Sequence, residues 1–387
     1  MPQKICLVLP GFAASELRLL AANGPVLWVS YTLLALGQIG KARLAPDGES
    51  PGPPDGVTCV PTGPLADYYQ PTIDVLSRDL ASAGYSVVGA GFDWRRSPAI
   101  LGAQLAGTIR ALATADNPLS IVAHSYGGIV ARFAWYFLGQ NNETNLVRRL
   151  VTLGTPHQGT YTPVAVFSQD EETFRQIFWL SGLVRGALSP GGSVILLPQW
   201  SMADLTQLAM TWPALYALFP LLDSADAPND PYRANLYNAA NWPAGLQPNA
   251  AWLDYSRVTL GTVLRDPSSM PPPQVLTTVA GAGVPTFATL ETPAILGNSA
   301  GLSVTDQGDG RVTVTSALVA GAAAYTLPVR HSDLTVSSMV LDHLAAWVLA
   351  ERPPPPPPPP TVTTAGTVVP ILTGPPLTQF NVLDPDC

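Results

Sequence analysis

The sequence predicts an α/β fold: a mostly parallel central sheet, helices on both of its faces, and a helical cap inserted into the core. Short runs rich in valine, isoleucine and leucine alternate with helical patterns over residues 1–160. Residues 161–273 are instead aromatic and proline-rich and show no clear strand pattern. Strand patterns return in residues 274–351. Because such alternation is typical of a parallel sheet covered by helices, residues 1–160 and 274–351 are expected to form one core.

Each element of the first core segment has its own local signal. Residues 4–9 are a short apolar run ended by Pro10-Gly11, which is typical of a buried strand. Apolar residues at helical spacing and a closing Gly84 predict a helix over 69–83. The other expected elements are strands at 85–90, 119–124 and 150–153, helices at 100–113 and after Ser125, and a loop at 41–64.

The later part of the chain contains further strands, a last helix and an unusual end. Strands are expected at 275–280, 311–314 and 324–329, and a helix at about 336–350. The unbroken prolines 353–360 predict an extended spacer of about 25 Å, at ~3.1 Å per residue. We expect residues 352–387 to be a flexible proline-rich tail with one β-like segment at 367–369. A tail that binds a protein partner is the alternative.

The most informative local pattern is Ala123-His124-Ser125-Tyr126-Gly127. A buried strand stops at Ser125, and a tight turn and a helical pattern follow it. Strand, serine, turn and helix form the nucleophile elbow of α/β-hydrolases, which lifts the serine hydroxyl clear of the sheet. Ala123 replaces the usual glycine and is small enough for the close strand–helix crossing. A serine that merely caps the helix is the alternative, and the context favours a nucleophile.

A serine nucleophile needs a base within hydrogen-bond reach and an acid that orients this base. The chain has four histidines. His331 follows a strand and opens a loop before the last helix, where α/β-hydrolases carry the base. His124 adjoins the nucleophile and is expected to be structural or to line the pocket. His157 precedes any late acid and His343 lies inside the last helix, so neither suits the role as well.

The orienting acid is expected shortly before the base, in a turn next to a valine-rich segment. Asp309 stands between two glycines, which let backbone N–H groups approach and hold its carboxylate ionised. Asp306 is the alternative acid. Asp333 follows His331 too closely to orient it, and is expected to be a surface carboxylate.

An oxyanion hole requires two N–H donors near the nucleophile. The first is expected from Tyr126, at the start of the helix, and the second from Phe12, in the loop after the first strand. Trp94, Arg95 and His157 are expected to contact the substrate or to brace the cap.

Composition excludes several classes of function. The net charge of −8 argues against non-specific nucleic-acid binding, which needs clustered lysine and arginine. The three cysteines are far apart and lack metal-ligand spacing, so neither a disulfide scaffold nor a metal site is expected. Gly281-Ala282-Gly283 lacks the third glycine of a dinucleotide loop, so no cofactor is expected.

The chain shows no signal for membrane insertion or export. No apolar run approaches the ~18 residues of a membrane span, and the apolar run 5–9 is too short for a signal peptide. We therefore expect a cytoplasmic protein, with non-classical export as the alternative. Aromatic residues of the cap could still meet a lipid surface transiently.

Several segments together resemble the lecithin:cholesterol acyltransferase-like branch of the α/β-hydrolases. The likeness runs in family order over about residues 4–350. Its segments are Leu9-Pro10-Gly11-Phe12, Asp93-Trp94-Arg95, Ala123-His124-Ser125-Tyr126-Gly127-Gly128, Leu153-Gly154-Thr155-Pro156 and Gly308-Asp309-Gly310-Arg311-Val312. Phe92 replaces a tyrosine of the family signature, and the paired cysteines of the mammalian members are absent.

The resemblance implies a serine ester hydrolase with a helical cap over an acyl pocket. It implies Ser125 as nucleophile, Asp309 as acid and His331 as base, with Phe12 and Tyr126 as oxyanion donors. The expected activity is lipase- or esterase-like cleavage of a carboxylic or lipid ester through an acyl-enzyme. Transfer of the acyl chain to an alcohol acceptor is the alternative, and a non-catalytic hydrolase-fold binding protein is a third possibility.

Overall fold

The computed structural model describes residues 4–28, 30, 36–178, 200–223, 229–349 and 369–370. Its centre is a six-stranded sheet in the order β11-β8-β7-β6-β1-β5, in which all neighbouring strands are parallel. The strands are β1 (Lys4–Leu9), β5 (Tyr85–Gly89), β6 (Leu119–His124), β7 (Val147–Leu153), β8 (Leu276–Gly281) and β11 (Ala323–Leu327). This sheet confirms the predicted α/β class.

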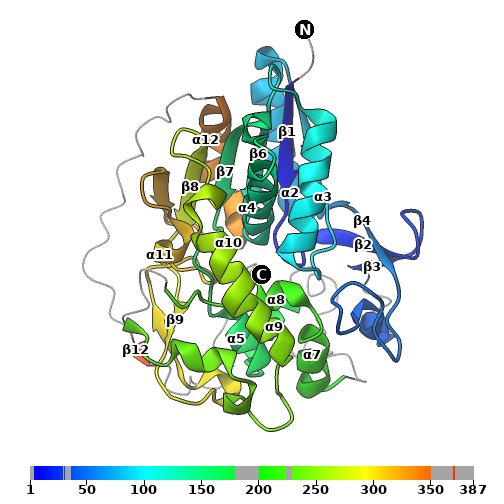
Figure 1. Cartoon of the computed structure of the whole chain (residues 1–387), viewed down its shortest axis with the longest axis vertical. Helices are drawn as coiled ribbons and strands as arrows, with labels where there is room; N and C mark the ends of the chain where they lie inside the picture. Colours follow the sequence, from blue (N-terminus) through cyan, green and yellow to red (C-terminus); the bar gives the residue numbers. More distant parts are fainter. Residues whose placement is uncertain are drawn as a thin grey trace, which may run out of the picture.

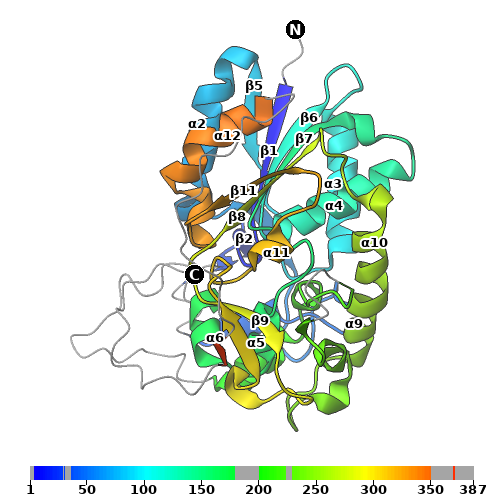
Figure 2. The same ribbon diagram turned by 90° about the vertical axis from the view of Figure 1, so that its left-hand side faces the viewer.

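Helices cover both faces of this sheet (Figures 1 and 2). One face carries α2 (Ala66–Leu80) and α12 (Ser338–Leu349), and the other carries α3 (Pro98–Leu112) and α4 (Tyr126–Gly139). Strand β1 shows why its apolar run is continuous. Cys6 and Val8 pack in the cluster with α2 and α12, whereas Leu7 and Leu9 belong to the cluster with α3 and α4. Both faces of a parallel strand are buried in this way.

The order of the strands determines where a site can form. The chain runs from β1 to β5 on one side and then returns to β6 on the other side of β1. Ligands of open parallel sheets bind beyond the carboxyl ends of the strands, where the strand order reverses. The loops after β1 and β6 therefore meet at the expected position of a site.

A second layer lies beyond this edge of the sheet, in the lower half of Figure 1. Its helices are α5 (Thr162–Phe167), α6 (Glu171–Phe178), α7 (Met202–Ala209), α8 (Pro213–Tyr216) and α9 (Ala250–Tyr255). A π-helical turn at Ser256–Leu260 leads from α9 to α10 (Gly261–Arg265), which packs beside α4. Strands β9 (Thr286–Leu290) and β10 (Leu302–Thr305) pair antiparallel and lie in the same layer. This layer is therefore not limited to the expected cap, residues 161–273, because β9 and β10 also belong to it.

The small strands differ from the expectation. Cys59–Pro64, inside the expected loop 41–64, forms β4 and pairs with β2 (Ser15–Leu19), which also pairs with β3 (Val26–Trp28). The prolines and glycine in β4 hide its strand character. The strand expected at 311–314 is wrong, because these residues form a turn that leads into α11 (Val314–Ala317).

The end of the chain is described only in part. The proline spacer 353–360 and most of the tail lie outside the described residues. Val369–Pro370 forms β12, which pairs antiparallel with β10. In the described part of the chain, no helix combines the length and the apolar character that crossing a membrane requires.

Candidate active site

Ser125 lies at the turn between β6 and α4, with backbone angles φ 52° and ψ −123°. A positive φ is strained for a residue with a side chain, and such strain is concentrated at functional sites. Glycine is required just after it. A Cβ on Gly127 would overlap the carbonyl oxygen of Pro10, and one on Gly128 would overlap Thr155. The start of α4 therefore lies directly against the loops that follow β1 and β7.

Asp309 and His331 are in contact. His331 Nδ1 lies 2.8 Å from Asp309 Oδ2, and the Asp309 side chain is fully buried. The other carboxylate oxygen, Oδ1, accepts hydrogen bonds from the N–H groups of Arg311 (2.9 Å) and Val312 (2.7 Å). These two bonds curl the backbone around the acid, which is why 311–314 is not a strand.

Gly154, at the end of β7, makes room for this pair. Its φ is +56°, and a Cβ there would lie 3.0 Å from His331 Nδ1 and 3.1 Å from Asp309 Oδ2. It would also lie 2.7 Å from a methyl group of Leu334. Any side chain at this position would press on the acid–base contact.

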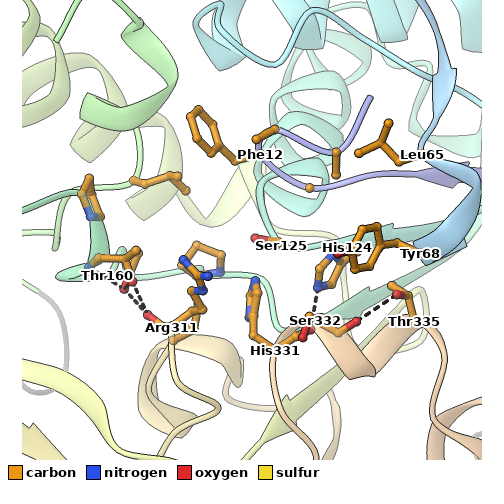
Figure 3. Close-up of a pocket in the computed structure, with 18 of the residues that line it drawn as sticks. Phe12, Leu65, Tyr68, His124, Ser125, Thr160, Arg311, His331, Ser332 and Thr335 are labelled. Carbon is orange, nitrogen blue, oxygen red and sulfur yellow. Dashed lines mark hydrogen bonds between the residues drawn. The ribbon is translucent and has the colours of Figure 1, made fainter. Parts of the chain in front are cut away.

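Ser125, His331 and Phe12 line one pocket of about 850 Å³, its open mouth included. Figure 3 shows the His331 ring pointing toward Ser125. Most of the wall is apolar or aromatic, and comes from Phe12, Ala13, Ala14, Trp28, Leu65, Tyr68, Pro156, Pro163, Leu215, Leu218 and Val312. The lining described contains one charged side chain, Arg311, and no carboxylate. Such a wall suits an apolar chain attached to a small polar group.

The two expected oxyanion donors belong to residues near Ser125. Tyr126 is the first residue of α4, so its N–H has no partner within the helix. Among the described residues, neither the Tyr126 N–H nor the Phe12 N–H donates to another group. Gly11, next to Phe12, lies close to the nucleophile: a Cβ on Gly11 would lie 3.5 Å from Ser125 Oγ.

Trp94 and Arg95 lie behind the pocket and are not among its lining residues. The Trp94 ring packs edge-on against Phe12 and Trp212, with centroids 5.0 and 5.1 Å apart. Arg95 pairs with both carboxylate oxygens of Asp93, at 2.8 and 2.7 Å, and both residues are buried. The Arg95 carbonyl accepts the N–H of Ala214. These contacts join the sheet to the second layer.

His157 is also outside the pocket lining. Its Nε2 lies 3.1 Å from Thr152 Oγ1, and its carbonyl accepts a hydrogen bond from Arg132. Burial lowers the pKa of His157 well below its ordinary value, and the nearby Arg132 charge lowers it further. The imidazole is therefore neutral at pH 7, in a structural setting.

His124 lines the pocket beside Ser125 and makes two hydrogen bonds. Its Nδ1 lies 2.8 Å from the hydroxyl of Tyr69, and its Nε2 lies 3.0 Å from the carbonyl oxygen of His331 (Figure 3). Tyr69 was not predicted to be a site residue. The only available signal was the apolar face of its helix, which predicts burial but no partner.

No metal centre is assembled from the described side chains, because no three His, Cys, Asp or Glu residues among them come together. His343, on α12, stacks on Trp347 at a centroid distance of 5.7 Å. Asp306 is exposed, in contrast to Asp309. The described part of the chain thus brings together Ser125, His331 and Asp309.

A family model matches one segment of the chain. The PGAP1-like alpha/beta domain matches residues 108–178, which include β6, the turn at Ser125 and α4. A search of curated proteins found no match.

Solved structures with a similar arrangement include lipases and esterases. The mature form of the lipase BlEst2 from Bacillus licheniformis is 13% identical, with a TM-score of 0.38; the match covers 86% of this chain and 87% of that one. EstA from Clostridium botulinum is 13% identical, with a TM-score of 0.37, and the coverage is 90% and 87%. The lin2722 product from Listeria innocua is 12% identical, with a TM-score of 0.34, and the coverage is 90% and 94%. Similarities this low say nothing about substrate.

Proposed function

We propose that this protein is a serine hydrolase that cleaves carboxylic esters through an acyl-enzyme. The observation that carries the proposal is the 2.8 Å contact between His331 Nδ1 and Asp309 Oδ2 in a pocket that Ser125 also lines. An acid that holds a histidine in one tautomer leaves the other ring nitrogen free to take the serine proton. The match of residues 108–178 to an α/β domain supports the same class.

The proposed reaction has two halves with one proton carrier. Ser125 Oγ attacks the ester carbonyl carbon while its proton moves to His331 Nε2. The N–H groups of Phe12 and Tyr126 hold the negative oxygen of the tetrahedral intermediate. His331 then gives the proton to the departing alcohol oxygen, and the acyl-serine remains. In the second half, His331 takes a proton from water, the hydroxide attacks the acyl carbon, and Ser125 Oγ regains the proton.

The proposed substrate carries an apolar chain on its ester group, such as a lipid ester. The aromatic and aliphatic wall of the pocket supports this choice, because burial of each CH₂ group contributes about 0.8 kcal/mol. The segments that resemble the lecithin:cholesterol acyltransferase-like branch support it as well. In this proposal residues 161–273 act as a cap, since Leu215 and Leu218 of that segment lie in the pocket wall.

The test is an ester assay on the wild type and on Ser125→Ala. We expect the wild type to hydrolyse p-nitrophenyl esters and the variant to lose at least about 10³-fold in kcat. Equal rates of the two proteins would refute the proposal. A series of esters of increasing acyl length, measured below and above their solubility limits, then tests the lipid substrate. Rates that fall steadily with acyl length would exclude a long-chain ester.

A further inference from the structure

A chain of three hydrogen bonds connects the loop after β1 with the loop that carries His331. The N–H of Gly11 donates to the hydroxyl oxygen of Tyr69 at 2.8 Å. Tyr69 Oη lies 2.8 Å from His124 Nδ1. On the other side of the ring, His124 Nε2 lies 3.0 Å from the carbonyl oxygen of His331. Two of these three bonds are buried throughout, and the third is partly buried.

The direction of each bond follows from the chemistry of its ends. A carbonyl oxygen only accepts, so His124 Nε2 must carry the ring hydrogen and donate to His331. In the neutral ring, Nδ1 is then bare and accepts the single proton of the Tyr69 hydroxyl. The Tyr69 oxygen still has lone pairs with which it accepts the Gly11 N–H. Every group in the chain thus has one compatible role.

The surroundings favour this neutral arrangement. Tyr69 is 2% exposed and His124 is 8% exposed. Burial lowers the pKa of His124 well below its ordinary value. The neighbouring His331 and Arg311 charges lower it further, and the hydrogen bond to the His331 carbonyl offsets only part of this. Burial raises the pKa of the Tyr69 hydroxyl. Both groups therefore keep their neutral forms at pH 7.

The two ends of this series of hydrogen bonds, Gly11 and His331, belong to the site. Gly11 precedes Phe12, whose N–H is the proposed oxyanion donor, and His331 is the proposed base. His124 itself precedes Ser125 and lies against the His331 ring, with centroids 4.8 Å apart. We propose that Tyr69 and His124 are positioning residues that hold the oxyanion loop and the base loop at a fixed separation across Ser125. This inference rests on the proposed hydrolase function.

A displaced donor or base is expected to cost rate more than substrate affinity. Tyr69 and His124 line the pocket, but Tyr69→Phe keeps the aromatic ring in the lining and removes only the hydroxyl group. Misplacement of a reacting group by about 1 Å can cost about a hundredfold in rate. We expect Tyr69→Phe to lower kcat about tenfold to a hundredfold and to change KM less than about twofold. Tyr85→Phe is the matched control. Tyr85 is buried and accepts one hydrogen bond from Arg148, at the opposite end of the sheet.

Loss of folded protein is separated from loss of positioning by counting active serines. A fluorophosphonate that reacts with Ser125 titrates the competent sites, and kcat is expressed per titrated site. If Tyr69→Phe keeps the wild-type kcat per site, the residue has only a structural role and the inference is wrong. If the wild type neither reacts with the fluorophosphonate nor hydrolyses esters, the proposed function fails instead.

Two substitutions of His124 each keep one of its two hydrogen bonds. Asn places an amide oxygen near the position of Nδ1 and retains the acceptor for Tyr69. Gln places an amide N–H near the position of Nε2 and retains the donor to His331. We expect Tyr69→Phe to reduce kcat further in the His124→Asn background and to have little additional effect in the His124→Gln background. Equal additional losses of kcat in both backgrounds would contradict the proposed series of hydrogen bonds.

A second readout does not depend on activity. In ¹⁵N-histidine-labelled wild-type protein at pH 7, we expect His124 to show a protonated Nε2 and a bare Nδ1 by NMR. A ring proton on Nδ1 would reverse the bond to Tyr69 and overturn the inference even in an active enzyme. In Tyr69→Phe the Nε2–H should persist, because its acceptor is the backbone of His331.

Discussion

His331 and Asp309 are joined twice. The N–H of His331 donates to the Asp309 carbonyl oxygen at 2.9 Å, and His331 Nδ1 lies 2.8 Å from Asp309 Oδ2. The backbone bond fixes the distance between the two loops, and the side-chain bond fixes the ring. In the proposed mechanism, these two bonds let Asp309 orient the imidazole ring of His331.

This arrangement predicts a large difference between two neighbouring acids. Asp309→Asn removes the charge and offers an amide that favours the wrong tautomer of His331, so kcat should fall about 10³- to 10⁴-fold. Asp306→Asn, at an exposed position three residues away, is the control and should retain nearly full activity. Kinetics on a soluble p-nitrophenyl ester measure both. The opposite result would assign the acid to Asp306.

Gly154 predicts a loss of activity that strain alone does not explain. A methyl group there would press on both His331 and Asp309, so Gly154→Ala should reduce kcat at least about tenfold. Gly84→Ala is the control. The φ of Gly84 is also positive, at +79°, but no atom lies within 4 Å of the added methyl group. Gly84→Ala should lose about 1–2 kcal/mol of stability from backbone strain. Gly154→Ala should lose more, because its methyl group also meets Leu334. If the two lose equal activity, the contact with His331 has no catalytic consequence.

Buried neutral histidines predict instability toward acid. In the unfolded chain a histidine titrates near ~6.5, whereas burial keeps the pKa values of His124 and His157 far lower in the folded protein. Below pH ~6.5 the unfolded chain therefore binds more protons, and the free energy of unfolding falls as the pH drops. By pH ~5.5 each histidine accounts for about 1.4 kcal/mol.

Urea titrations of the wild type and of His157→Gln measure this effect. The variant should be less stable than the wild type at pH 7.5, because the bond to Thr152 is weakened. The difference between the two proteins should shrink by about 1.4 kcal/mol on going to pH 5.5. A difference that stays constant with pH would show that His157 is not a source of acid sensitivity.

Deletion of residues 353–387 predicts little change in catalysis. The described part of this tail contributes two residues, Val369–Pro370, to the edge of β10. We expect kcat/KM within about twofold of the full chain and a small decrease in Tm, since one short edge pairing is lost. Ester kinetics and thermal melts of the two proteins test this. A large loss of kcat/KM would give the tail a part in the reaction.

The sequence predicted features that depend on local order. The strand before Ser125 and the turn around Asp309 are encoded by neighbouring residues, and they could be identified without knowing distant contacts. The strand predicted at 311–314 was wrong, because Arg311 and Val312 use their N–H groups for the Asp309 carboxylate. Valine-rich composition does not reveal such a competing acceptor.

Features that depend on contacts between distant segments were not predictable. Tyr69 and His124 are 55 residues apart, and no spacing rule connects a helix residue to the end of a strand. The same is true of Gly154, whose need for an absent side chain arises from His331 and Asp309. Trp94 and Arg95 were expected to touch the substrate or to brace the cap, and only their packing distinguishes the two roles.

The backbone of Ser125 has a consequence for engineering the protein. At φ 52° and ψ −123° a glycine is tolerated at little cost, whereas a residue with a Cβ is destabilised by about 1–3 kcal/mol. Two variants that lack the Ser125 hydroxyl, Ser125→Gly and Ser125→Ala, should therefore reverse the usual order, in which alanine is the more stable of the two. The glycine variant should melt at the higher temperature. Under the proposed function the protein gives up stability at its nucleophile, so selection for heat resistance alone should favour loss of this serine.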